Sequence, residues 1–147
     1  MSVSDLNYLC VEQERFQLSA TRKVIMSGLT EVIDKIKETR LVAELWVDGS
    51  FLTEKINPED ADVVLSVFDS EKGDLTKEQY DVIEWVTGNL KDEFHCDSYV
   101  FFRYPERSSH FQLGDFMRSY WMTLFAFGRG QKQRRGIAVI TLQESMI

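Results

Sequence analysis

Two short apolar runs near the middle of the chain constrain its fold more than any other feature. Residues 41–47 (LVAELWV) and 62–68 (DVVLSVF) are rich in β-branched and aromatic residues and carry little charge. Runs of this length and composition predict strands that are buried on both faces of a sheet. Gly49 and Pro58 lie between them, and such residues predict a loop.

Helical periodicity flanks both runs. Apolar residues that recur every three or four positions predict a helix over about residues 19–39. Thr76 and Gln79 have the spacing of a capping box, so a second helix is expected to begin there. A broad apolar and aromatic face over residues 116–127, ending near Gly128, predicts a third helix.

Two more strands complete the expected fold. Residues 97–102 (DSYVFF) and 136–142 (GIAVITL) are short, apolar and rich in strand formers. The order becomes helix, strand, strand, helix, strand, helix, strand. It predicts an α/β or α+β class, with a mixed sheet of about four strands flanked by helices. The length suits a single domain over residues 1–147.

The net charge of −7 disfavours general nucleic-acid binding, which needs a basic groove. Lys132, Arg134 and Arg135 form a local basic patch, which leaves contact with an RNA acceptor or a nucleotide phosphate open. A solvated loop is the simpler interpretation of that patch. Cys10 and Cys96 are too few for a zinc site or a disulfide framework, and we expect reduced thiols in a cytoplasmic protein.

The sequence predicts no membrane segment. It contains no apolar stretch of about 18 residues, the length needed to span a bilayer. The first residues, MSVSDLNYLCVEQERF, include acidic side chains and lack the apolar region of a signal peptide. Both observations favour a protein that works away from membranes.

The residues around the two central runs are the candidates for chemistry. Gly49 and Ser50 directly follow a buried strand, where glycine lets the backbone approach a ligand closely. If a helix begins there, its N–H groups would point at a phosphate. Asp60 and Asp62 share one face of a strand, an arrangement that is costly unless a cation lies between the carboxylates. Asp97 adds a third hard oxygen ligand suited to Mg²⁺. Taken singly, these features are also explained by a turn, a solvated strand edge and a capping aspartate.

Together these residues resemble the DNA polymerase beta-type nucleotidyltransferase superfamily. The closer resemblance is to small bacterial and phage members with the pattern W-x-D-G-S-F-x-T-x-K-x-x-P-x-D-x-D-V. The chain matches it in order at Trp46, Asp48, Gly49, Ser50, Phe51, Thr53, Lys55, Pro58, Asp60, Asp62 and Val63. The resemblance extends from the first helix to the last strand, but its sharp motif covers only the middle of the chain.

This resemblance implies a minimal nucleotidyltransferase fold and a reaction. The protein would transfer a nucleoside monophosphate from an NTP, with ATP as the expected donor, to a hydroxyl group on a protein, an RNA or another nucleotide. Gly49 and Ser50 would hold the β- and γ-phosphates. Lys55 would neutralise phosphate charge.

The resemblance also implies a metal cofactor. Asp60 and Asp62 would bind Mg²⁺ or Mn²⁺, and Asp97 would bind a second ion or act as the base. Two such ions can clamp the attacking and leaving oxygens of a phosphoryl transfer.

A second hypothesis is a nucleotide-binding or catalytically silent module that acts by docking a protein partner or another copy of itself. An antitoxin or a subunit of a phage-defence system would suit it. The short chain and the broad aromatic face over residues 116–127 motivate this alternative. His95 and Cys96 suggest no catalytic pair, because neighbouring strand residues point to opposite faces. His110 is expected to lie in a loop.

Overall fold

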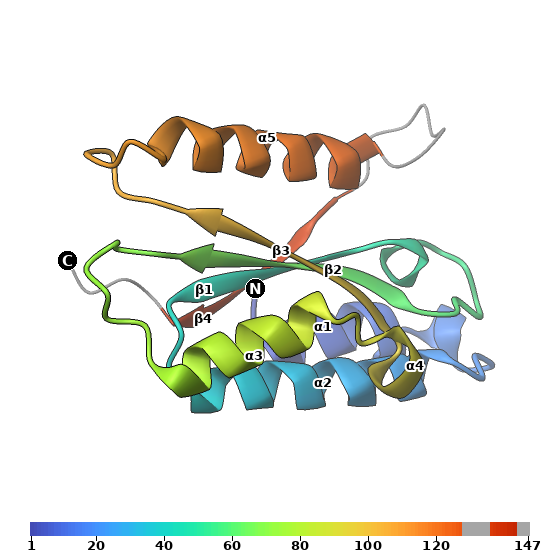
Figure 1. Cartoon of the computed structure of the whole chain (residues 1–147). Helices are drawn as coiled ribbons and strands as arrows, with labels where there is room; N and C mark the ends of the chain where they lie inside the picture. The colour runs from blue at the N-terminus through green and yellow to red at the C-terminus, as the bar shows by residue number, and fades with distance from the viewer. Residues whose placement is uncertain (128–135, 144–147) are drawn as a thin grey trace.

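A four-stranded sheet in the order β3-β2-β1-β4 forms the frame of the molecule (Figure 1). The computed structural model describes residues 1–127 and 136–143. The strands are β1 (Ala43–Asp48), β2 (Ala61–Phe68), β3 (Cys96–Arg103) and β4 (Ala138–Gln143). β1 pairs antiparallel with both β2 and β4, whereas β2 and β3 are parallel. The mixed sheet flanked by helices, which the sequence predicts, is confirmed.

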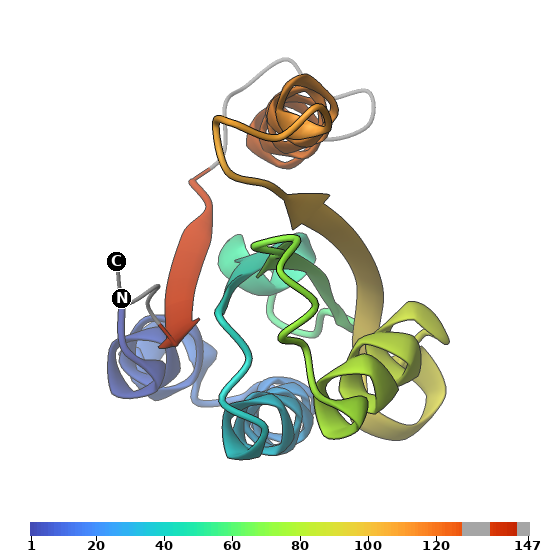
Figure 2. The same ribbon diagram turned by 60° about the vertical axis from the view of Figure 1, so that its left-hand side comes forward.

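The helices cover the two faces of the sheet unequally. Among the helices of the described residues, α1 to α4 lie on one face and α5 lies alone on the other (Figures 1 and 2). The α-helices are α1 (Val3–Asn7), α2 (Arg22–Glu38), α3 (Lys77–Thr87), α4 (Lys91–Phe94) and α5 (Phe111–Phe127). Three single-turn elements are a π-helix η1 (Tyr8–Glu12) and two 3₁₀-helices, η2 (Glu14–Phe16) and η3 (Ser50–Leu52).

Alternation along the strands divides the core in two. Successive side chains of a strand point to opposite faces, so Leu45 and Trp46 enter different layers. Leu45 packs with α2, whose apolar stripe is fully buried. Trp46 joins the smaller cluster under α5, together with Val64, Phe101 and Phe125. Alternate residues of the strands therefore supply the two layers of the core, and the apolar stripe of α2 packs in the larger one.

A glycine sets the close contact between α2 and α4. A side chain at Gly28 would overlap the backbone carbonyl of Phe94, so only glycine fits there. α4 then ends at His95, which adopts the left-handed conformation before β3 begins at Cys96. The backbone of α4 thus lies directly against α2, two residues before β3 begins.

Several boundaries differ from the expectations. α2, α3 and the four strands lie close to the predicted positions, and the capping box of Thr76 and Gln79 is confirmed. α5 begins at Phe111, five residues before the predicted start. α1, η1 and η2 were not predicted, because short elements carry too few residues for a clear period.

Other sequence features fall elsewhere than expected. The short helix α4 was also not predicted from the sequence. The basic patch at Lys132, Arg134 and Arg135, together with Gly128, lies outside the described residues. Of the helices described here, none is long and apolar enough to cross a membrane.

Candidate functional site

Strand register brings three aspartates into one row across the sheet. Asp48, the last residue of β1, pairs with Asp62 on β2, and Asp62 pairs with Asp97 on β3. Residues paired directly across strands point to the same face, with Cβ atoms about 5 Å apart. Two positions further into the sheet, Trp46, Val64 and Tyr99 form the next row on the same face, and they pack on the α5 side. The three carboxylates therefore belong to the α5 face.

Gly49 packs directly against one of these carboxylates. Its φ of 88° and ψ of −167° belong to a region that is essentially restricted to glycine. A Cβ atom there would lie 2.8 Å from Oδ2 of Asp62 and 3.2 Å from the Asp62 backbone nitrogen. The absent side chain thus lets the turn after β1 contact the Asp62 carboxylate.

The loop that follows Gly49 is held by a buried arginine. Arg22, the first residue of α2, is 1% exposed, and burial lowers the pKa of its guanidinium. The guanidinium stacks 3.6 Å from the centre of the Phe16 ring. It also donates to backbone carbonyls in the N-terminal segment and in the loop: Cys10 (2.9 Å), Phe51 (2.6 Å), Thr53 (2.7 Å) and Lys55 (2.6 Å). Arg22 therefore ties the loop to α2.

Ser50 and Lys55 contribute mainly backbone groups to this loop. The Ser50 carbonyl accepts a hydrogen bond from the Thr53 hydroxyl at 2.7 Å. Only the three-residue η3 begins at Ser50, so the helix N-terminus considered from the sequence reduces to one 3₁₀ turn. The side chain of Lys55 is exposed. Its carbonyl is the atom bound by Arg22.

Asp60 lies just before β2 and forms an ion pair outside the row. Its Oδ2 is 3.5 Å from Nζ of Lys91 at the start of α4, and the two side chains are 20% and 55% exposed. The charge of Asp60 is the main cause of the raised pKa of Lys91. From the sequence, a cation is expected between the carboxylates of Asp60 and Asp62. In the structure, a lysine ammonium lies beside Asp60.

Asp97 is oriented by two donors. Nδ2 of Asn89 donates to Oδ1 at 2.9 Å, and the hydroxyl of Tyr99 donates to Oδ2 at 3.1 Å. The Tyr99 ring lies against Trp121 of α5, with ring centroids 5.0 Å apart. Asp97 is thereby coupled to α5 through one aromatic contact.

The donor set suits a hard divalent cation. In the part of the chain that the structure describes, no three His, Cys, Asp or Glu side chains already converge as metal ligands. Mg²⁺ commonly binds through one or two carboxylates and completes its shell with water and phosphate oxygens. Two adjacent carboxylates, Asp62 and Asp97, beside the side-chain-free surface of Gly49 fit that requirement.

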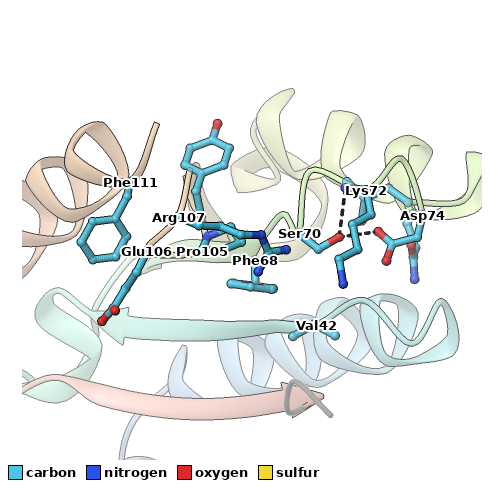
Figure 3. Close-up of a pocket in the computed structure, with 12 residues that line it drawn as sticks. Val42, Phe68, Ser70, Lys72, Asp74, Pro105, Glu106, Arg107 and Phe111 are labelled. Atoms are coloured by element: carbon cyan, nitrogen blue, oxygen red, sulfur yellow. Dashed lines mark hydrogen bonds between the residues drawn. The ribbon is translucent and has the colours of Figure 1, made fainter. Parts of the chain in front are cut away.

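A cavity of about 720 Å³ lies at the opposite end of the sheet from this row. It borders Phe68 at the end of β2 and Tyr104 just after β3, whereas Asp62 and Asp97 lie near the start of these strands. Figure 3 shows Lys72 and Arg107 beside this cavity. Its size would admit a small ligand. We place the candidate chemistry at the aspartate row, because the cavity does not contain the grouped carboxylates.

Sequence reasoning missed three residues that shape the site. Asp48 was noted only as part of the motif, although its place at the end of a buried strand was a usable signal. Lys91 and Arg22 gave no signal, because isolated basic residues on helices are usually solvated. Their roles depend on contacts with Asp60 and with the loop after Gly49, which are distant in sequence.

Comparison with known proteins identifies a family without assigning a function. The model of a family of unknown function, DUF6932, matches residues 2–141. No curated protein and no solved structure matches the chain. The function therefore has to be inferred from the chain's own residues.

Proposed function

We propose that this chain, which belongs to the DUF6932 family, is a metal-dependent nucleotidyltransferase. It would transfer a nucleoside monophosphate from an NTP, with ATP as the expected donor, to a hydroxyl acceptor on protein, RNA or a nucleotide. The observation that carries the proposal is the contact of the Gly49 turn with the Asp62 carboxylate. In the superfamily that the motif resembles, a glycine-serine turn and a strand carboxylate form one site.

The row of aspartates supports a division of roles. Asp62, at the centre of the row, is the proposed metal ligand next to the phosphates. Asp60 would be a second ligand, and the ion would then replace Lys91 as the positive charge beside it. Mg²⁺ or Mn²⁺ bound there would neutralise the charge of the triphosphate. Gly49 lets the turn lie against the Asp62 carboxylate, and the backbone N–H of Ser50 in that turn would be a donor for the phosphate oxygens.

Asp97 is the proposed proton acceptor. An acceptor hydroxyl would attack the α-phosphorus, the bond from this phosphorus to the pyrophosphate oxygen would break, and the hydroxyl proton would pass to Asp97. Asn89 and Tyr99 hold the Asp97 carboxylate by hydrogen bonds, which keeps it oriented for this step. Positioning and electrostatics would supply the catalysis.

One observation favours the alternative of a catalytically silent module. Asp60 is paired with Lys91, and both oxygens of Asp97 accept hydrogen bonds from protein groups. Carboxylates satisfied in this way are stable without a metal. A silent module would bind a nucleotide, or none, and act through a partner protein.

A nucleotide panel separates these functions. We expect ATP with Mg²⁺ to raise the melting temperature by several degrees, because a ligand at a hundred times its Kd adds about 2.7 kcal/mol of stability. ATP without Mg²⁺ should have a much smaller effect. Label from α-labelled ATP should appear on an acceptor when the protein is incubated with cellular protein and RNA fractions.

Asp62→Asn is the decisive variant, because it removes the charge and keeps the shape of the side chain. It should abolish label transfer and the Mg²⁺-dependent shift. Asp34→Asn on the exposed side of α2 is the matched control and should change neither. Transfer that survives in Asp62→Asn would exclude this mechanism. A shift without transfer would favour the silent module.

A further inference from the structure

α5 carries large apolar side chains on its exposed side as well as on its buried side, which is unusual for a helix on the surface of a protein. Its inner side buries Gly114, Phe125 and Ala126 above the sheet. Its outer side is exposed at Leu113 (56%), Phe116 (65%), Tyr120 (50%) and Phe127 (46%). Amphipathic surface helices normally present polar residues to water, and a helix that is apolar all round is normally buried.

The outer apolar residues form a narrow stripe. Leu113, Phe116, Tyr120, Leu124 and Phe127 follow one another at intervals of three or four residues, and all but the half-buried Leu124 are exposed. At 3.6 residues per turn they fall within about 80° of the helix circumference. The inner residues Gly114 and Phe125 lie on the other side. We call these five residues the outer stripe. Among the described elements, no other helix or strand lies over this side of α5 (Figures 1 and 2).

The outer stripe is symmetric about its central residue. Phe116 and Leu124 are each four residues from Tyr120, and Leu113 and Phe127 are each seven residues from it. In an antiparallel helix pair related by a two-fold axis, a residue that precedes the axis faces the residue equally far beyond it. A stripe with this spacing is therefore complementary to a second copy of itself.

We propose that the protein forms a two-fold dimer in which the α5 helices pack antiparallel through the outer stripe. The axis passes through Tyr120, which meets Tyr120 of the partner subunit. Phe116 packs against Leu124 of the partner subunit, and Leu113 packs against Phe127 of the partner subunit.

Charge supports a second copy as the occupant. Asp115 and Arg118 are the only acidic and basic residues of α5, and both lie outside the outer stripe. Two copies can therefore meet along it without facing like charges. A nucleic acid would instead need cationic side chains on this surface. A membrane-binding helix would carry several basic residues on its polar side.

The exposed area predicts a modest affinity. The three exposed rings each offer about 100 Å², because roughly half of each aromatic side chain is uncovered. With the two leucines and their neighbours, the stripe offers about 500 Å² per copy, close to the lower limit for a specific interface. We therefore expect dissociation at micromolar concentrations.

A disulfide across the axis tests the geometry. Tyr120→Cys places two thiols opposite each other, and both native cysteines are buried. Under mild oxidation this variant should form a covalent dimer at least about tenfold faster than Asp115→Cys, which lies on the same helix off the stripe. Equal rates for the two variants would overturn the proposed arrangement.

Sedimentation of the intact chain tests the association itself. Wild-type protein should shift from monomer to dimer across the micromolar range. Phe116→Glu should remain a monomer, because it would place a charge in the apolar contact. Leu18→Glu, at a side chain that is 91% exposed and far from α5 in sequence, should leave the dimer intact. A monomeric wild type throughout the range, or a Phe116→Glu dimer, would refute the proposal.

Discussion

At the scale of single residues, two positions hold the turn beside Asp62. Gly49 provides a backbone conformation that residues with side chains rarely adopt, and it leaves the space that the Asp62 carboxylate fills. The buried Arg22 side chain stabilises the following loop by donating hydrogen bonds to the carbonyls of Phe51 and Thr53. Gly49 and Arg22 therefore shape the site through the backbone, and neither side chain needs to contact a substrate.

Gly49→Ala should destabilise the protein more than the same change at Gly73. Gly73 also has a positive φ of 70°, but nothing lies within 4 Å of an added Cβ atom there. We expect a loss of about 1 kcal/mol for Gly73→Ala, from backbone strain alone. Gly49→Ala should cost about 2–4 kcal/mol, because overlap with Asp62 adds to the strain. Urea unfolding of both variants measures the difference, and equal losses would show that the contact with Asp62 is unimportant.

At the scale of elements, the start of α3 connects two layers of the fold. The Thr76 hydroxyl accepts from the backbone N–H of Gln79, and the Gln79 side chain accepts from the Thr76 N–H. Gln79 also donates to the carbonyl of Thr39, at the end of α2. One capping box therefore ends the loop after β2 and fixes α3 against α2. The parallel pairing of β2 and β3 depends on this crossover.

Thr76→Ala should lower the free energy of unfolding by about 1 kcal/mol, the usual value of an N-cap. Thr87→Ala is a matched control at the other end of the same helix. The Thr87 hydroxyl donates to the Ile83 carbonyl, which lies four residues earlier in the same helix. Such a hydrogen bond adds little to helix stability, so the loss of the hydroxyl should be close to neutral. Thermal or urea unfolding measures both variants, and a neutral Thr76→Ala would show that α3 is held by packing alone.

At the scale of the whole molecule, the larger core lies between the sheet and α1 to α4, and it encloses both thiols. Burial raises the pKa of Cys10 to about 11, partly offset by the positive charge of Arg22. Burial also raises the pKa of Cys96 to about 12, with a further contribution from the negative charge of Asp60. Both groups remain protonated in the folded protein at pH values where the unfolded chain ionises them.

The two thiols should make stability fall at alkaline pH. Their pKa values are raised in the folded state, so their contribution is fully present below the unfolded value of 9.0 and is lost as the pH rises toward 11 and 12. Urea unfolding at a series of alkaline pH values should show a shallower decline for the Cys10→Ala, Cys96→Ala double variant than for wild type. Identical slopes would mean that the thiols titrate normally in the folded chain.

The periodic elements were determined by the sequence itself, because the spacing of apolar residues along a helix or strand is a local property. This is why α2, α3 and all four strands could be predicted close to their observed positions. Asp60, Asp62, Asp97, Gly49, Ser50 and Lys55 could be proposed as site residues on their types and spacing. Their grouping could not be derived from spacing alone.

Only the tertiary structure decided which of these residues meet. Strand register aligned Asp62 with Asp97 and added Asp48 to their row, while α4 brought Lys91 to Asp60. Packing also orients α5 so that Phe125 covers the sheet while four residues of the outer stripe, Leu113, Phe116, Tyr120 and Phe127, stay exposed. Each outcome depends on contacts between segments far apart in the chain, which no local pattern encodes.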